Sequence, residues 1–163
     1  MTRIINTIKL NKKIAYLQKL KSLNKESGLI FNSLDNILND FIGHKLFTIL
    51  KFDKINSNLE RVYTNKPREY PLQGKKDVIR NFWQVQVLEK GIAYIGYNFQ
   101  DIKTSFSDFD LIKKLGCSSV LIIPVKSGDN IKGSVNLLHE ESWYSDNDVK
   151  EAQKIVQLIS EVL

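Results

Sequence analysis

The residue types that most often carry out chemistry in enzymes are scarce in this sequence. Cys117 is the only cysteine, and His44 and His139 are the only histidines. His139 is followed by two glutamates but by no second histidine four residues on, so the zinc-protease pattern is absent. We therefore interpret both histidines as structural residues, and we expect no metal site.

Cys117 follows Gly116 at the start of a predicted strand. The carboxyl end of a preceding helix raises the pKa of a thiol, which disfavours a reactive thiolate at this position. We interpret Cys117 as buried and inert. No glycine pattern predicts a phosphate loop or a dinucleotide site. Because no complete catalytic set is present, we expect a protein that is not an enzyme and that needs no cofactor.

A set of aromatic and polar residues lies in segments that would cover one face of a sheet. Asn136 alternates with Val135 and Leu137 in a predicted central strand, where a buried amide must find hydrogen-bond partners. Either a loop backbone satisfies this amide, or the amide faces a cavity. The aromatic residues either fill the core or form the walls of that cavity. The candidate ligand-binding residues are Trp83, Tyr94, Asn136, Thr48 and Phe106.

Two helices are predicted at the amino end of the chain. Apolar residues recur among lysines at spacings that predict an amphipathic helix from Thr7 to Lys21. Residues 24–28 interrupt this pattern. A second apolar stripe predicts a helix from Leu29 to Ile42, which Gly43 ends.

The rest of the chain alternates β-rich runs with shorter helical segments. Pro67, Pro71 and Gly74 predict a loop over residues 68–76. The expected strands are 46–53, 59–64, 92–98, 118–126 and 131–140. The expected helices are 77–89, 108–115 and a last helix capped by Ser145. Strand hairpins with helices packed on them predict an α+β domain with a mostly antiparallel sheet of five or six strands.

The composition is that of an ordinary globular domain. The chain has 163 residues, of which 42% are hydrophobic and 26% are charged. No apolar run reaches the roughly 18 residues that a membrane span needs, and no signal-peptide pattern stands at the amino end. A single cysteine is typical of a reducing compartment. We therefore expect a cytoplasmic protein without a membrane span.

The positive charge is concentrated at the amino end. The net charge is +6, and residues 1–25 carry seven basic residues and no acidic ones. Lysines outnumber arginines by 20 to 4. Because bidentate recognition of guanine or phosphate relies on arginine, we expect no sequence-specific binding of nucleic acid. A basic amphipathic helix can join a dimer or lie on an anionic membrane, and we predict the former, with solvated lysines.

The stretch from Leu46 to Leu163 resembles bacterial GAF domains, in particular a small, stand-alone, proteobacterial-type subgroup. The resemblance rests on a set of short motifs that are specific only together: Leu46-Phe47-Thr48-Ile49-Leu50, Arg61-Val62-Tyr63, Tyr70-Pro71, Trp83 with Gln86-Val87-Leu88, Gly91 with Tyr94-Ile95-Gly96, Leu115-Gly116-Cys117, Pro124-Val125, and Asn136 to Glu141 followed by Trp143-Tyr144. It divides the chain into a basic amphipathic helix with a linker (1–28) and a GAF domain (29–163).

The resemblance implies a sheet with the terminal helices on one face and a ligand pocket on the other. It also implies a sensory or regulatory protein that binds an unknown small molecule without catalysis, and that acts as a homodimer through its terminal helices or on a partner protein. Trp83 would form a wall of the pocket, Tyr94 and Thr48 its floor or rim, and Asn136 would orient the ligand. The Asn-Lys-x-Phe-Asp pattern of GAF domains that bind cyclic nucleotides is absent.

Two alternatives come from other functional classes. The first is a small redox enzyme similar to the free methionine sulfoxide reductases, which would need a reactive thiol at Cys117 and a partner thiol. The second is a pure protein-interaction module, in which the first helix is the working surface. A pocket filled by Trp83 and Phe106 would indicate this second alternative.

Overall fold

In the part of the chain that the structure describes, six strands form one antiparallel sheet in the order β3-β2-β1-β6-β5-β4. The structure is a computed structural model that describes residues 4–163. Strands β1 and β2 form one long hairpin, and β5 and β6 form another. The two hairpins pair with each other through β1 and β6, which therefore lie at the centre of the sheet. The strands are β1 (Leu46–Asp53), β2 (Asn58–Thr64), β3 (Lys75–Asp77), β4 (Tyr94–Gly96), β5 (Ser119–Ser127) and β6 (Asn130–His139).

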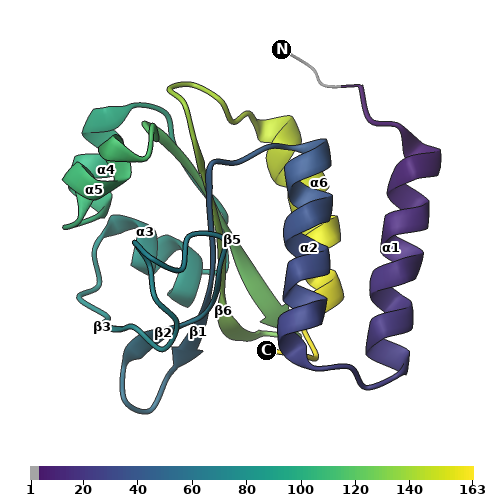
Figure 1. The fold of residues 1–163 in the computed structure, drawn as a ribbon. Helices are drawn as coiled ribbons and strands as arrows, with labels where there is room; N and C mark the ends of the chain where they lie inside the picture. Colours follow the sequence, from purple (N-terminus) through teal and green to yellow (C-terminus); the bar gives the residue numbers. More distant parts are fainter. Residues whose placement is uncertain (1–3) are drawn as a thin grey trace.

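Helices cover both faces of the sheet, as Figure 1 shows. On one side, α2 (Ser27–Phe41) and α6 (Asp146–Val156) pack on the sheet, and α1 (Thr7–Ser22) lies outside them. Shorter helical segments cover the other face: α3 (Phe82–Gln84), the π-helical turn η1 (Val85–Glu89), α4 (Phe99–Ser105) and α5 (Phe109–Lys114). A 3-10 turn, η2 (Gln157–Ile159), follows α6. The predicted α+β class and the placement of the terminal helices on one face are confirmed.

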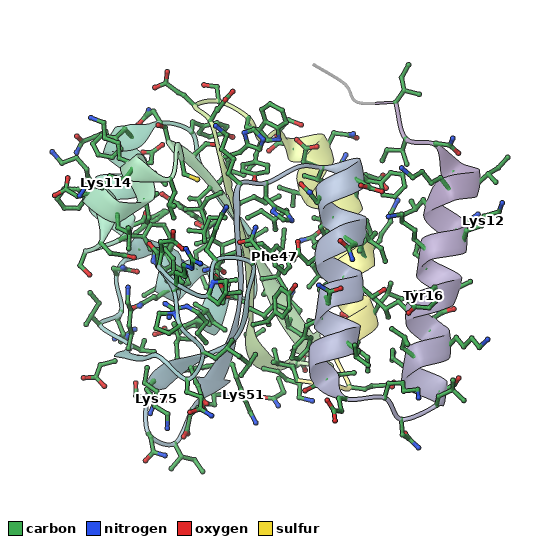
Figure 2. All side chains as sticks on the ribbon, viewed as in Figure 1. Lys12, Tyr16, Phe47, Lys51, Lys75 and Lys114 are labelled. Carbon is green, nitrogen blue, oxygen red and sulfur yellow. The ribbon has the colours of Figure 1, made fainter. Side chains whose placement is uncertain are left out.

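Strand alternation divides the core into two clusters. On β5, the side chains of Leu121 and Ile123 belong to the cluster beneath α2 and α6, whereas Val120 and Ile122 belong to the cluster on the opposite face. The same alternation operates on β1, where Phe47 lies on the helix side, as Figure 2 shows. A strand buried on both faces reads as a continuous apolar run, which is why both faces of β5 are apolar in the sequence.

The terminal helices begin at side-chain caps. The Ser145 side chain accepts a hydrogen bond from the Asp148 backbone nitrogen, and the Asp148 carboxylate reaches back to the Ser145 nitrogen, so α6 begins with a capping box. Asn6 caps α1 in the simpler way, by accepting from the Lys9 backbone nitrogen. Residues 4–163 contain no helix with the length and apolar character that a membrane crossing requires.

The α1 helix is attached to α2 by apolar contacts and by charge. Leu17 and Leu20 are buried between the two helices. Lys9 and Lys13 both form ion pairs with Asp40 of α2, at N–O distances of 3.1 and 2.6 Å. The hydrogen bond from Lys13, together with both lysine charges, holds the pKa of the Asp40 carboxyl below its usual value despite partial burial.

Three segments differ from the sequence prediction. Residues 68–76 were expected to be a loop, yet Lys75–Asp77 pair with β2 as the edge strand β3. The helix expected from Asp77 starts only at Phe82, because residues 75–77 are extended and Asn81 supplies the cap. The helix α4 was not predicted. The remaining predicted helices and strands are present with small shifts at their ends.

Candidate functional site

A cavity of about 330 Å³ lies on the sheet face opposite α2 and α6. Its floor comes from β1, β2 and β6, and its roof from the β2–β3 connection, α3 and the segment that joins α4 to α5. Most of its walls are apolar side chains: Leu46, Leu50, Leu59, Ile79, Trp83, Phe106, Ile112 and Leu138. A concave, mostly apolar space with polar groups at a few positions is typical of a small-molecule site.

Thr48 and Asn136 form the polar part of the floor. They are direct cross-strand partners between β1 and β6, and both line the cavity. The Asn136 oxygen Oδ1 accepts a hydrogen bond from the Ser134 hydroxyl, at 2.8 Å. Within residues 4–163, the Asn136 amide nitrogen has no hydrogen-bond partner, although the side chain is only 3% exposed. The floor therefore presents amide donors to the cavity.

Trp83 and Phe106 form one wall. The Trp83 indole nitrogen donates to the Ser105 carbonyl oxygen at 3.1 Å, and the Asn81 amide donates to the same oxygen at 3.2 Å. The Trp83 and Phe106 rings lie with their centroids 6.0 Å apart at an interplanar angle of 35°. Both rings line the cavity and leave it open.

Arg61 projects from β2 and lines the cavity beside the β2–β3 connection. Its Nη1 donates to the Pro71 carbonyl oxygen at 2.9 Å, and its guanidinium carbon lies 4.9 Å from the centroid of the Tyr70 ring. A Cβ atom at Gly74 would stand 2.7 Å from Nη1, so a side chain there would displace the guanidinium. The connecting loop therefore holds Arg61 from two sides.

A second group of polar side chains, Tyr70, Lys76 and Asp108, lies in the roof of the cavity. The Tyr70 hydroxyl donates to Asp108 Oδ2, and Lys76 forms an ion pair with Asp108 Oδ1 at 3.2 Å. Burial and the hydrogen bond to Asp108 raise the pKa of Tyr70. Burial alone would raise the pKa of Asp108, but the Tyr70 hydrogen bond and the Lys76 charge hold it below its ordinary value. Asp108 is thus an ionised acceptor that joins the β2–β3 connection to the start of α5.

Four of the five candidate residues from the sequence line the cavity: Thr48, Trp83, Phe106 and Asn136. Tyr94 does not. It lies on β4, at the far edge of the sheet, beside a shallow surface groove that it shares with Phe82 and Tyr97. Its hydroxyl lies 3.2 Å from the Ser105 hydroxyl, so Tyr94 supports the roof from outside. Four further cavity-lining residues were not predicted from the sequence: Arg61, Tyr70, Lys76 and Asp108.

The residues that most often carry out chemistry lie outside the cavity. Cys117 is fully buried, and burial raises the pKa of its thiol to about 11. His44 is buried between α2 and β1, where its Nε2 lies 2.8 Å from Asp35 Oδ1. His139 stacks on Trp143 with the ring centroids 3.5 Å apart. Within the described part of the chain, no three metal-binding side chains of the His, Cys, Asp or Glu types come together.

No family model matches the sequence, and no curated protein matches it. Solved structures do match. The phycocyanobilin-bound GAF domain of a cyanobacterial phytochrome has a TM-score of 0.71 at 12% identity, over 98% of this chain and 94% of that one. The fRMsr of Staphylococcus aureus, solved in complex with its substrate, has a TM-score of 0.70 at 13% identity, over 99% and 97%.

The chromophore-binding domain of a bacteriophytochrome from R. palustris also matches, with a TM-score of 0.69 at 9% identity. The match covers 99% of this chain but 62% of that one, so this chain corresponds to part of the longer protein. At these identities the likeness concerns the fold. The chain therefore has the GAF fold, with its six-stranded sheet between the terminal helices and the shorter helices.

Proposed function

We propose that the protein is a non-catalytic sensory or regulatory module that binds a small molecule in the cavity above β1, β2 and β6. The observation that carries the proposal is the Asn136 amide, which is almost fully buried, faces a cavity of about 330 Å³ and has an unpaired nitrogen within residues 4–163. A donor that faces a cavity and has no partner in the protein is free to pair with a ligand acceptor. The cavity volume lies within the range of small-molecule sites.

A thermal-shift screen with a metabolite collection tests this proposal. A ligand present at about 100 times its Kd adds about 2.7 kcal/mol to the stability of the folded state, which is a clear shift in Tm. We expect at least one compound to raise the Tm of the wild type and to lose its effect on Asn136→Ala. Asn130→Ala, at the exposed first residue of β6, is the matched control. A collection without any stabilising compound would contradict the proposal.

The sheet offers a direct path from the cavity to the helices. Thr48 and Asn136 face the cavity, whereas their neighbours Phe47 and Leu137 pack beneath α2 and α6. Ligand binding that shifts β1 or β6 therefore changes the packing of the helices on the opposite face. This arrangement suits a module that passes binding to a second copy or to a partner protein.

Dimerisation through α1 is the second part of the proposal. Leu17 and Leu20 are used in packing against α2, but Ile8 and Tyr16 of the same helix and Leu23 at its C-cap remain exposed, at 72%, 59% and 56%. Exposed apolar groups that gather on one element usually mark a contact surface. A second copy that presents the same helix would cover them in a symmetric interface.

Light scattering after gel filtration measures the oligomeric state. We expect twice the 18.8 kDa monomer mass for the wild type and the monomer mass for Tyr16→Glu. Lys114→Glu is the control. Figure 2 shows Tyr16 on α1 and Lys114 on the opposite side of the molecule. A wild-type protein that stays at the monomer mass as its concentration rises would contradict dimerisation. Salt-sensitive binding to anionic vesicles would instead assign α1 to a membrane surface.

A redox enzyme is the competing function, because the fRMsr of Staphylococcus aureus has the same fold. The surroundings of Cys117 disfavour it. The thiol is fully buried, its raised pKa keeps it protonated at neutral pH, and the sequence holds no second cysteine to resolve an intermediate. We expect no reduction of free methionine sulfoxide by the wild type. Turnover that is lost in Cys117→Ser would overturn this assignment.

A further inference from the structure

Arg61 is a cavity-lining cation whose direct contacts supply no negative charge. Its Nη1 donates to the Pro71 carbonyl, and its guanidinium lies over the Tyr70 ring. The Nε atom is fully buried and has no hydrogen-bond partner among the described residues. Within residues 4–163, Nη2 has no partner either. Burial lowers the pKa of Arg61, which means that the surroundings disfavour its charge.

The two carboxylates that line the cavity form no ion pair with Arg61 among the described residues, although the Asp108 charge acts on the guanidinium from a longer distance. Asp108 is occupied by the Tyr70 hydroxyl and by Lys76. Asp77 lies exposed on the edge strand β3. Among the described residues, neither carboxylate comes within 4.0 Å of an Arg61 nitrogen, the distance that defines an ion pair. A half-buried cation without a partner is destabilising, and a bound anion would relieve that cost.

The other open groups of the cavity indicate what kind of anion would fit. The Asn136 amide offers donors from the floor, and the Thr48 hydroxyl stands beside it without a hydrogen bond to any described residue. Around them the walls are apolar, with Trp83 and Phe106 on one side and leucines on the sheet. A single guanidinium balances one negative charge. Because Lys76 is already paired with Asp108, and Asp77 adds a further negative charge, the cavity does not balance a second one, which disfavours a phosphate dianion.

We propose that the cavity binds a small organic carboxylate with an apolar or aromatic body. The carboxylate is held by Arg61, with Asn136 and Thr48 as further donors, and the body lies against Trp83 and Phe106. This assignment rests on the proposed function, because it names the ligand class of the same cavity. Arg61 determines the specificity for the charged group, and the apolar walls determine the size of the body.

Charge-matched probes test the assignment on the wild-type protein alone. The probes are 4-methylpentanoate, benzoate and 3-phenylpropanoate, each compared with its primary amide, and inorganic phosphate. Binding is followed in ¹H–¹⁵N spectra through the Trp83 indole and Arg61 Nε signals, which report on the wall and on the anchoring cation. We expect at least one acid to shift both signals saturably and to bind at least tenfold more tightly than its amide, and phosphate to bind more weakly than that acid.

Two variants then locate the preference. Arg61→Gln should reduce the affinity for the acid at least tenfold and leave the affinity for the amide unchanged within about twofold, whereas Arg61→Lys should keep part of the preference. Arg80→Gln is the matched control, because Arg80 is exposed and pairs with Glu89 away from the cavity. The wild-type comparison requires no variant, so it remains decisive if Arg61→Gln does not fold.

Each of three results would overturn the assignment. Amides that bind in the cavity as tightly as the acids would leave the proposed function standing and remove the anionic ligand class. Acid binding that survives Arg61→Gln would show that another group holds the charge. In the third result, every acid fails to bind, but the metabolite screen yields a neutral or cationic ligand that shifts the Trp83 signal. This result would refute the carboxylate assignment and leave the proposed small-molecule site standing.

Discussion

The indole nitrogen of Trp83 donates a hydrogen bond to the carbonyl oxygen of Ser105, 3.1 Å away, and so joins α3 to the end of α4 above the cavity. The Asn81 amide donates to the same oxygen. Two side chains from the α3 segment therefore converge on one backbone acceptor. This convergence fixes the roof at the point where the aromatic wall begins.

Trp83→Phe should loosen this connection while keeping an aromatic ring in the wall. The lost hydrogen bond and the smaller ring should together lower the free energy of unfolding by about 1–2 kcal/mol, since one buried hydrogen bond contributes about 1 kcal/mol. Urea denaturation followed by circular dichroism measures the change. The neighbouring Phe82 is 74% exposed, so Phe82→Leu should stay within about 0.5 kcal/mol of the wild type. Equal losses in both variants would contradict the role of the indole nitrogen.

Ser134 and Asn136 should behave as a coupled pair. Ser134 is fully buried, and its hydroxyl donates to the Asn136 oxygen. Asn136→Val leaves that hydroxyl without its partner, which should cost about 1–3 kcal/mol. Adding Ser134→Ala removes the orphaned hydroxyl and should restore part of the loss. A double-mutant cycle by urea denaturation measures the coupling, and strictly additive losses would show that the two side chains act independently.

The sequence predicted the floor of the cavity better than its roof, for a physical reason. Period-two alternation in a strand fixes which of its side chains share a face, so Thr48 and Asn136 could each be assigned to a face of the sheet without coordinates. The position of a residue across the sheet depends on strand order, which alternation does not contain. Tyr94 pairs with Ile122 and so lies on the cavity face, but β4 is the far edge of the sheet and the cavity lies over β1, β2 and β6.

Arg61, Tyr70 and Asp108 come together only through the tertiary fold. The β2–β3 connection turns back on β2, where the Arg61 backbone nitrogen donates to the Gly74 carbonyl and the Gln73 nitrogen donates to the Arg61 carbonyl. Two prolines and a glycine predicted a loop here, but they do not predict where the loop lies. Arg61 stands two residues after Leu59 on a predicted strand, so the two side chains were expected on the same face of the sheet. This spacing was the available signal that Arg61 lies beside an apolar residue.

A buried polar group beneath α2, on the side of the sheet opposite the cavity, should contribute to stability. Asp35 of α2 contacts His44 Nε2 at 2.8 Å and accepts a hydrogen bond from the Tyr63 hydroxyl at 2.8 Å. Asp35→Ala leaves the buried His44 ring and the partly buried Tyr63 hydroxyl without this partner, which should cost about 3 kcal/mol. Asn36→Ala, at the exposed neighbouring position, should change stability by less than about 0.5 kcal/mol. Thermal and urea unfolding give both values, and a small loss in Asp35→Ala would show that the pair is dispensable.

Asp108 should make the roof of the cavity sensitive to acid. Its pKa is lowered in the folded state, so its ionised form adds stability at every pH above the value of an unfolded aspartate, 3.8. That contribution is lost as the pH falls below this value and through the lower pKa of the folded state. The wild type should therefore exceed Asp108→Asn in stability by a constant margin near neutral pH, and the margin should shrink as the pH falls below about 4.

Unfolding curves of the two proteins between pH 7 and pH 2 measure this margin. Other carboxylates, such as Asp40, titrate in both proteins, so their contribution cancels in the difference. Asp110→Asn removes an exposed carboxylate from the same helix without altering the contacts of Tyr70 and Lys76, and it should stay within about 0.5 kcal/mol of the wild type. Because the amide oxygen introduced by Asp108→Asn would still accept from Tyr70, the margin reports the charge of Asp108 and its pairing with Lys76. A margin that grows as the pH falls would mean that Asp108 is protonated more easily in the folded state, and the ionised Tyr70–Asp108–Lys76 group would have to be abandoned.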